Sequence, residues 1–317
     1  MKKFASPSLL ALIAAATSIV PATANAHAPE NCAVSGKIER VAAKGSSDRI
    51  TVELAGKKDG PDIVLIPGLS TPRDVWDDTV RSFAGCYRLH LVQVRGFGDA
   101  PGANAKGPVL EPLVMTVSDY IDDMIFDAGR GKPQIIGHSF GGLTAMKVGL
   151  AIPEKVGGVM VVDSLPFFGA MFGATSAEGQ VEQQAGAMRK GIQAAKEPGL
   201  DARTLSTMSR SKEGQAKVLG WVKRGSNIVA GQVLYEVMTA DIREDLTANK
   251  VPLTMLYPIN PDSPFPAEMS ENLYKSSYKD IPNATLKRID DSAHFIMLDQ
   301  PEAFQAAVKG FLVPPSK

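Results

Sequence analysis

The segment that most restricts how this chain can fold is the G-H-S-F-G pentapeptide at residues 137–141. An apolar run typical of a buried strand, Gln134–Ile136, precedes it, and residues 142–146 have a composition typical of a helix. A turn that leads directly from a strand into a helix forces its central residue into a strained backbone conformation. Glycine two positions before and two positions after avoids a clash with that residue. The segment therefore predicts a sharp strand–turn–helix unit that exposes the hydroxyl of Ser139.

The rest of the chain alternates short apolar runs with amphipathic stretches, a pattern typical of parallel βαβ units. We expect strands at residues 34–41, 49–54, 62–66, 87–94, 133–137, 156–162, 252–257 and 285–289. We expect helices at residues 72–84, 116–128, 140–151, 267–278 and 301–312. The predicted fold class is α/β, with a mostly parallel sheet flanked by helices.

The alternation is interrupted between residues 164 and 246, where no strand-like run occurs. Helical patches at residues 178–195 and 216–222 indicate that this long stretch has structure of its own. We interpret residues 164–246 as an inserted helical cap. The core is then formed by residues 27–163 and 247–317.

The N-terminus has the features of a bacterial signal peptide. Lys2 and Lys3 precede an apolar run over residues 9–20, and Ala24-Asn25-Ala26 supplies the small-x-small cleavage pattern. The apolar run is too short to span a bilayer, so a membrane anchor is not expected. We therefore predict that residues 1–26 are removed and that the protein is periplasmic or secreted.

Charge and cysteine usage restrict the possible partners. The 34 Lys and Arg residues equal the 34 Asp and Glu residues in number, so nothing indicates binding to nucleic acid or anionic lipid. The two cysteines, Cys32 and Cys86, can form one disulfide in an oxidising compartment and attach the N-terminal arm. Two buried free thiols are the alternative. The sequence contains no Cys/His cluster typical of a metal site.

A serine hydroxyl becomes a good nucleophile only when a base takes its proton. Of the four histidines, His27 lies at the cleavage site, His90 lies inside a predicted strand, and the side chain of His138 should point away from that of Ser139. His294 remains, in the loop after the last predicted strand, at the edge where α/β sheets hold their sites. We predict that His294 is the base.

An acid is needed to orient the imidazole and to stabilise it when it is protonated. Asp262 follows the penultimate predicted strand, and Asp163 directly follows the strand at residues 156–162. Asp262 is preferred because it produces the chain order Ser, Asp, His. Asp163 stays open as the alternative acid.

Backbone N–H groups must also stabilise the oxygen charge that develops when a carbonyl is attacked. The N–H of Phe140, directly after Ser139, is one expected donor. The second is expected in the turn at residues 67–70, where Leu69 is the candidate.

Four motifs in this order resemble those of the α/β-hydrolase superfamily, and the resemblance covers most of the mature chain. They are the Pro-Gly-Leu turn at residues 67–69, the Arg-Gly-Phe-Gly turn at 95–98, the Gly-His-Ser-Phe-Gly-Gly turn at 137–142 and the Ala-His-Phe at 293–295. The resemblance implies a mostly parallel sheet, a cap inserted after the sixth strand and hydrolysis through an acyl-enzyme. It implies no metal and no organic cofactor.

The chain also departs from the superfamily at several positions. It has Pro67 where a histidine is frequent, Gln93 where an aspartate is frequent, and no Gly-x-x-Asp motif before Asp262. The turn carries Ser139 where the related haloalkane dehalogenases and epoxide hydrolases use aspartate, which argues against those two reactions.

The expected substrate is a small molecule, a carboxylic ester of moderate size. Large apolar side chains in the inserted segment can line an acyl pocket or simply attach the segment to the core. They are Phe167, Phe168, Met171, Phe172, Met188 and Met238.

Three other functions remain open. An exported aminopeptidase of the same fold would need carboxylates such as Glu178, Glu182 and Glu236 to hold a substrate amine. A cofactor-free C–C hydrolase or lyase would keep the same three side chains. A non-catalytic ligand-binding module would not react at Ser139.

Overall fold

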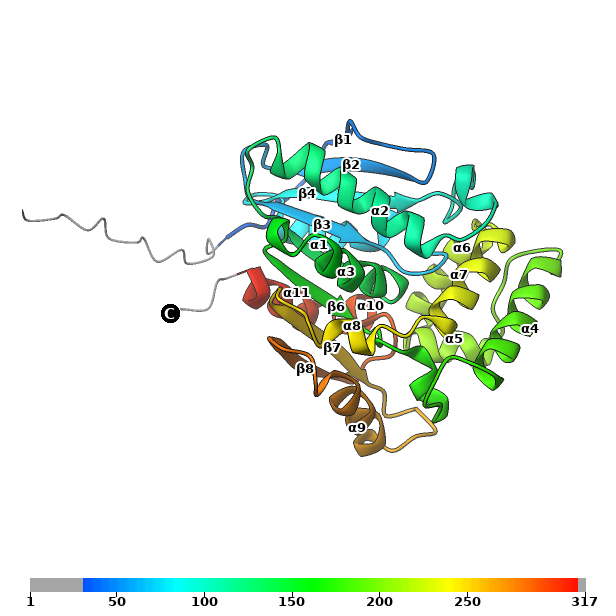
Figure 1. Ribbon diagram of the computed structural model, residues 1–317. Helices are drawn as coiled ribbons and strands as arrows, with labels where there is room; N and C mark the ends of the chain where they lie inside the picture. The colour runs from blue at the N-terminus through cyan, green and yellow to red at the C-terminus, as the bar shows by residue number, and fades with distance from the viewer. Residues whose placement is uncertain (1–30, 313–317) are drawn as a thin grey trace, which may run out of the picture.

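The computed structural model describes residues 31–312, so the expected signal peptide at residues 1–26 and His27 lie outside the described residues. The strands form one eight-stranded sheet in the order β1-β2-β4-β3-β5-β6-β7-β8 (Figure 1). They are β1 (Arg40–Ala42), β2 (Ile50–Gly56), β3 (Asp62–Ile66), β4 (Arg88–Val94), β5 (Gln134–His138), β6 (Gly158–Val162), β7 (Leu253–Ile259) and β8 (Ala284–Asp290). The pairs β1–β2 and β2–β4 are antiparallel, and the other pairs are parallel. The predicted α/β fold class is confirmed.

The central strands are buried on both faces. All residues of β3 and β6 are buried, which explains why, apart from Asp62 at the start of β3, these strands are apolar without polar alternation. Their side chains still alternate between the two faces of the sheet. Val64, Ile66 and Ile135 belong to one core cluster, and Ile63, Leu65 and Ile136 belong to the other.

Helices cover both faces of the sheet. On one face lie α2 (Leu110–Ile121), α3 (Phe140–Ala151) and α9 (Ala267–Tyr278), and on the other lie α1 (Asp77–Phe83), α10 (Ile296–Asp299) and α11 (Pro301–Leu312). Helix α2 begins before the expected residue 116. Glu236 explains the difference, because its carboxylate accepts the backbone N–H groups of Val109 and Leu110, 127 and 126 residues away in the chain. The local sequence carries no sign of this distant partner.

A helical segment connects β6 to β7. It contains η5 (Phe168–Phe172), α4 (Gln180–Ala194), α5 (Ala202–Met208), α6 (Lys212–Lys223), α7 (Asn227–Thr239) and α8 (Arg243–Leu246). Figure 1 shows α4 to α7 grouped beside one end of the sheet. The side chains of Asp201, Ser211 and Ser226 accept backbone N–H groups at the starts of α5, α6 and α7. We call residues 164–246 the inserted segment. No helix of residues 31–312 is long and apolar enough to cross a membrane.

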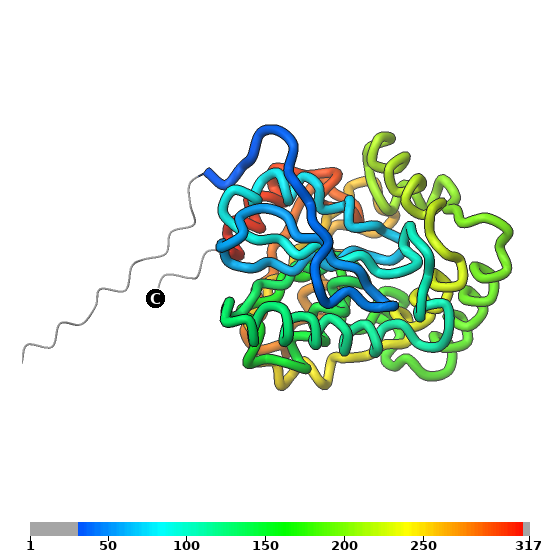
Figure 2. Tube along the Cα trace, turned by 90° about the horizontal axis from the view of Figure 1, so that it is seen from above, coloured from blue at the N-terminus to red at the C-terminus, as the bar shows by residue number. Residues whose placement is uncertain are grey.

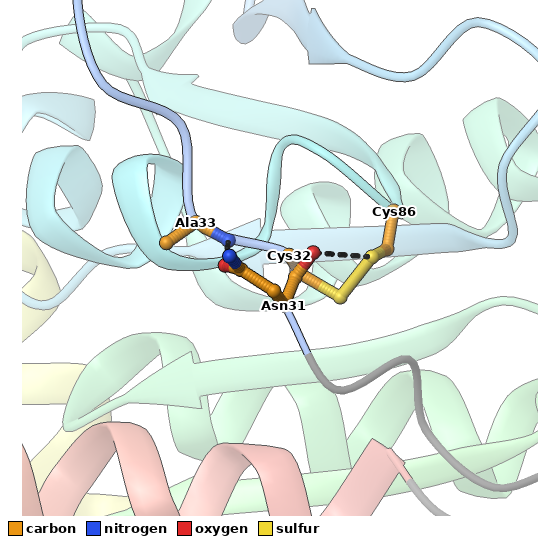
Figure 3. The surroundings of a disulfide bond; sticks show 4 residues. All are labelled: Asn31, Cys32, Ala33 and Cys86. Carbon is orange, nitrogen blue, oxygen red and sulfur yellow. Dashed lines mark hydrogen bonds between the residues drawn. A yellow bond between two sulfur atoms is a disulfide. The ribbon is translucent and has the colours of Figure 1, made fainter.

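The first described residues run along the outside of the molecule instead of forming the strand expected at residues 34–41 (Figure 2). Only residues 40–42 pair as β1. Before that point the backbone bonds to the region of α1, where the N–H of Val34 donates to the carbonyl of Arg81 at 2.8 Å. The expected pairing of cysteines is present: a disulfide joins Cys32 to Cys86, with a Cα–Cα distance of 5.0 Å (Figure 3). It attaches the N-terminal arm to the loop before β4.

Candidate active site

The sharp turn predicted at residues 137–141 is present at the carboxyl end of β5. Ser139 has φ 53° and ψ −119°, between the last residue of β5 and the first residue of α3. Its N–H donates to the carbonyl of Val162 at 2.9 Å, which joins the turn to the end of β6. A Cβ atom added to Gly137 would lie 2.1 Å from the carbonyl oxygen of Gly141. The flanking glycine is therefore a steric requirement of this turn.

His294 lies in the loop between β8 and α10, and its partner is Asp163. The Nδ1 atom of His294 is 2.6 Å from Oδ2 of Asp163, which directly follows β6. A carboxylate accepts hydrogen bonds, so Nδ1 carries the proton and Nε2 is left as the acceptor. This tautomer is the one that can take a proton from a hydroxyl. The Asp163 side chain is only 12% exposed, so little water competes for the contact.

The structure corrects the preference for Asp262 as the partner of His294. The Asp262 side chain is 70% exposed and forms an ion pair with Nε of Arg210 at 3.0 Å. Asp262 lies in the exposed turn beyond β7, whereas Asp163 is the first residue after β6, beside the turn of Ser139. The alternative acid, Asp163, is the one that the fold brings to the imidazole.

His138 has a contact that the sequence did not predict. Its Nε2 is 3.0 Å from the backbone carbonyl of His294, so this nitrogen donates. The ring centroid of His138 lies 4.6 Å from those of His294 and Phe295. Burial, with a smaller contribution from His294, lowers the pKa of His138 well below 6.5, so the ring is neutral. The His138 side chain therefore packs against the loop of His294.

The turn after β3 packs against Ser139. A Cβ atom added to Gly68 would lie 3.3 Å from Cβ of Ser139. Leu69, the next residue, is partly buried in this turn. Phe140 is the first residue of α3, so its N–H has no acceptor within the helix. The two expected donors, Leu69 and Phe140, thus belong to segments that flank Ser139. The N-terminus of α3 also favours negative charge near this residue.

Gln93, one of the departures from the superfamily, joins two turns at this edge of the sheet. Its Oε1 accepts the N–H of Arg73 at 3.0 Å, and its Nε2 donates to the carbonyl of Phe97 at 2.8 Å. The amide supplies both a donor and an acceptor, which an ionised aspartate cannot.

The inserted segment contributes directly to the histidine loop. The N–H groups of His294 and Phe295 donate to the carbonyls of Thr207 and Met208, at 3.2 and 2.8 Å. Asp299 accepts the N–H of Ala293 at 2.9 Å and also the hydroxyl of Ser209 at 2.6 Å. The loop is therefore held by the inserted segment as well as by the core.

The six large apolar side chains of the inserted segment are not equivalent. Phe167 and Met238 are buried, and the guanidinium of Arg243 lies over the Phe167 ring. Phe168 is partly buried and contacts Phe172 edge to face at 5.7 Å. Met171, Phe172 and Met188 are exposed. Packing thus accounts for the first two, while the exposed ones remain candidates for contact with a substrate.

Residues 31–312 contain no group of three or more His, Cys, Asp or Glu side chains that could hold a metal ion. The buried side chain of His90 contacts Asp62 and Tyr120, at 2.7 and 2.8 Å.

Comparisons with known proteins show what this chain is similar to. The family model described as the alpha/beta hydrolase family matches residues 63–307. The pimeloyl-[acyl-carrier protein] methyl ester esterase of Nitrosomonas europaea is 26% identical over 264 residues, which cover 80% of this chain and 96% of that protein. The enzyme of the same name from Pectobacterium carotovorum is 28% identical over 258 residues, covering 79% and 93%.

Solved structures share the fold at low identity. A thermophilic esterase from Thermogutta terrifontis has a TM-score of 0.67 at 18% identity, covering 86% of this chain and 98% of that one. A hydrolase from Pseudomonas aeruginosa has a TM-score of 0.65 at 16% identity, covering 89% and 100%.

Proposed function

Because the chain belongs to the alpha/beta hydrolase family, we propose that it is a serine hydrolase that cleaves a carboxylic ester through an acyl-enzyme on Ser139. The observation that carries the proposal is the hydrogen bond of His294 to Asp163, beside the strained turn of Ser139. The N–H of Ser139 bonds to Val162, the residue before Asp163, so nucleophile and acid stand on neighbouring strand ends. The esterases among the similar proteins support an ester as the substrate.

In the proposed mechanism, Nε2 of His294 takes the proton of the Ser139 hydroxyl while Oγ attacks the ester carbonyl. The N–H groups of Leu69 and Phe140 donate to the oxyanion that forms. His294 then gives its proton to the leaving alkoxide, and the alcohol departs. Water attacks the acyl-enzyme while His294 takes its proton. The C–O bond to Ser139 then breaks, His294 returns the proton to Oγ of Ser139, and the acid is released. Asp163 stabilises the imidazolium each time it forms.

The contacts of the carboxylates favour an ester over a substrate amine. Glu236, one of three candidates for binding an amine, is occupied by the N–H groups at the start of α2. Glu178 and Glu182 are exposed, and Glu182 accepts the hydroxyl of Tyr235 at 3.4 Å. Glu236 and Glu182 therefore serve different partners, and Glu178 is exposed, so the three offer no shared site for an ammonium group.

We further propose that the inserted segment acts as a cap and that Phe168, Met171 and Phe172 contact the acyl part of a small-molecule ester. The exposure of Met171 and Phe172 supports such a role. The measurement is the dependence of kcat/KM on acyl chain length, compared between the wild type and Phe172→Ser. An unchanged preference in the variant would contradict the assignment.

Export is also a proposal. The Cys32–Cys86 disulfide supports it, because such bonds persist in oxidising compartments such as the periplasm. N-terminal sequencing of protein from the periplasm or medium is expected to begin at His27. A chain that retains Met1 in the cytoplasm would exclude the proposed signal peptide.

The test of function is the substitution Ser139→Ala, with Ser206→Ala as the control on an exposed serine of α5. We expect the wild type to hydrolyse members of a chromogenic ester panel and to be labelled by a fluorophosphonate. In Ser139→Ala, kcat falls by about 10⁴-fold or more and labelling disappears, with an unchanged circular dichroism spectrum. Hydrolysis by this variant at the wild-type rate would refute the proposal.

A further inference from the structure

We propose that Tyr274 is a positioning residue of this site: its hydroxyl holds the second oxygen of Asp163 and thereby sets how strongly this carboxylate supports His294. The inference rests on the function proposed for Ser139 and His294.

The two oxygens of Asp163 have separate donors. The Tyr274 hydroxyl donates to Oδ1 at 2.6 Å, and Nδ1 of His294 donates to Oδ2 at 2.6 Å. The donors come from different elements, α9 and the loop after β8, 111 and 131 residues along the chain from Asp163. With one oxygen fixed by α9, rotation of the carboxylate would break the hydrogen bond of the tyrosine. The orientation of the other oxygen toward His294 is therefore determined as well.

Tyr274 is itself rigidly held. Its ring is buried and stacks on Tyr257 of β7, with the ring centroids 4.9 Å apart and the planes 26° apart. Burial and the charge of Asp163 raise the pKa of Tyr274 well above 10. The hydroxyl therefore stays a neutral donor over the whole pH range in which an ester hydrolase can be assayed.

The next turn of the same helix offers a natural comparison. Tyr278 is buried like Tyr274, and its hydroxyl donates to the backbone carbonyl of Ser164 at 2.7 Å, one residue beyond Asp163. The titratable groups around the carboxylate are thus Tyr274 and Tyr278 from α9 and His294 from the loop after β8. The ring of His138, at the end of β5, packs against the imidazole of His294, with the centroids 4.6 Å apart. Tyr278 shares the helix, the burial and the chemistry of Tyr274, but its hydroxyl does not bond to the carboxylate.

Removal of the Tyr274 hydroxyl has a defined consequence for the site. Oδ1 loses its donor in a buried place, so the negative charge of Asp163 is less well satisfied. The imidazolium of His294 then becomes the main group that stabilises this charge. Protonated His294 is favoured, and the neutral base forms only at higher pH. The acid limb of the pH–rate profile moves upward.

The experiment compares Tyr274→Phe with its matched control, Tyr278→Phe. Two quantities are measured: the pH dependence of kcat/KM on a chromogenic ester, and the NMR titration midpoint of the His294 ring. In Tyr274→Phe we expect both to move to higher pH by about one unit and kcat to fall by about tenfold. In Tyr278→Phe we expect thermal stability to fall by about as much as in Tyr274→Phe. The acid limb and the NMR midpoint should stay at their wild-type values.

A third variant of the same chain keeps the proposal testable if Tyr274→Phe does not fold. Replacement of Tyr274 by 3-fluorotyrosine preserves the ring and makes the hydroxyl a stronger donor, so both midpoints should move to lower pH. The proposal is overturned if both midpoints stay at the wild-type value in the Tyr274 variants, or if Tyr278→Phe moves them equally. Failure of the proposed function is seen separately as the absence of ester hydrolysis. The NMR midpoint of His294 still reports on the hydrogen bond between Tyr274 and Asp163 in that case.

Discussion

Asp163 owes its position to the ends of two neighbouring strands. His138 pairs with Val162 in the β5–β6 register, so the residues that follow them, Ser139 and Asp163, emerge side by side. Both have positive φ values, 53° and 47°, which are uncommon for residues other than glycine. Strain of this kind at two adjacent strand ends is typical of functional sites.

At the residue scale we predict that Asp163→Asn reduces kcat/KM by about 10³–10⁴-fold. A neutral amide stabilises the imidazolium less than a carboxylate does. Its N–H group can also donate to Nδ1 of His294, which favours the tautomer with the proton on Nε2. Asp262→Asn is the matched control, since it makes the same change in an exposed ion pair with Arg210. We expect it to stay within about threefold of the wild type. Ester hydrolysis kinetics check both. A larger loss in Asp262→Asn than in Asp163→Asn would reverse the assignment of the acid.

The strand–turn–helix formed by β5 and α3 is the element on which the site depends. Its tightness leaves no room for side chains at the flanking positions. A Cβ atom at Gly141 would lie 2.3 Å from the carbonyl oxygen of Ile66, in addition to the clash already described at Gly137. Both clashes involve backbone atoms, which cannot move away as a flexible side chain can. The turn and the neighbouring strand β3 therefore hold each other in place.

At the element scale we predict that Gly137→Ala destabilises the protein by about 3 kcal/mol or more, because overpacking here displaces backbone. Gly220→Ala is the control, because Gly220 is exposed in α6 and its added Cβ meets nothing within 4 Å. It should raise stability by up to about 1 kcal/mol through helix propensity. Urea unfolding midpoints measure both changes. Equal midpoints for the two variants would contradict this account of the turn.

Two neutral histidines are buried in different parts of the molecule, His90 in β4 and His138 in β5. His90 contacts Asp62, which also pairs with Arg130 at 2.8 Å. Burial lowers the pKa of His90 in spite of this carboxylate, and burial lowers that of His138 well below 6.5. The folded protein thus resists protonation at both positions, whereas both rings are free to take up protons in the unfolded chain.

At the scale of the whole molecule we predict that stability falls as the pH decreases below about 6.5, where the unfolded histidines bind protons and the folded ones do not. Above that pH both histidines are neutral in the folded and the unfolded chain, so they cause no loss in the free energy of unfolding. The loss is at most about 1.4 kcal/mol per pH unit for each histidine. Urea unfolding at pH 8, 7, 6 and 5 measures it, and His90→Gln should make the dependence shallower. A free energy of unfolding that stays constant from pH 7 to pH 5 would rule out the prediction.

The sequence by itself determined the features that depend on local spacing. The strand–turn–helix around Ser139 and the α/β alternation follow from residues close together in the chain, whose periodicity and steric needs can be read directly. His294 is predicted by elimination among the four histidines and by its place after the last predicted strand. The start of α2 could not be read in this way, because its capping carboxylate, Glu236, lies in α7.

Only the tertiary structure decided which carboxylate holds His294 and what holds that carboxylate. Asp163 and Asp262 both follow strands, and nothing in their local sequence shows that one reaches the imidazole while the other faces Arg210. Tyr274 and His138 meet the site across 111 and 156 residues of chain. Such contacts depend on strand order and on how loops curve back over the sheet, and these arise from packing of the whole chain rather than from any segment of it.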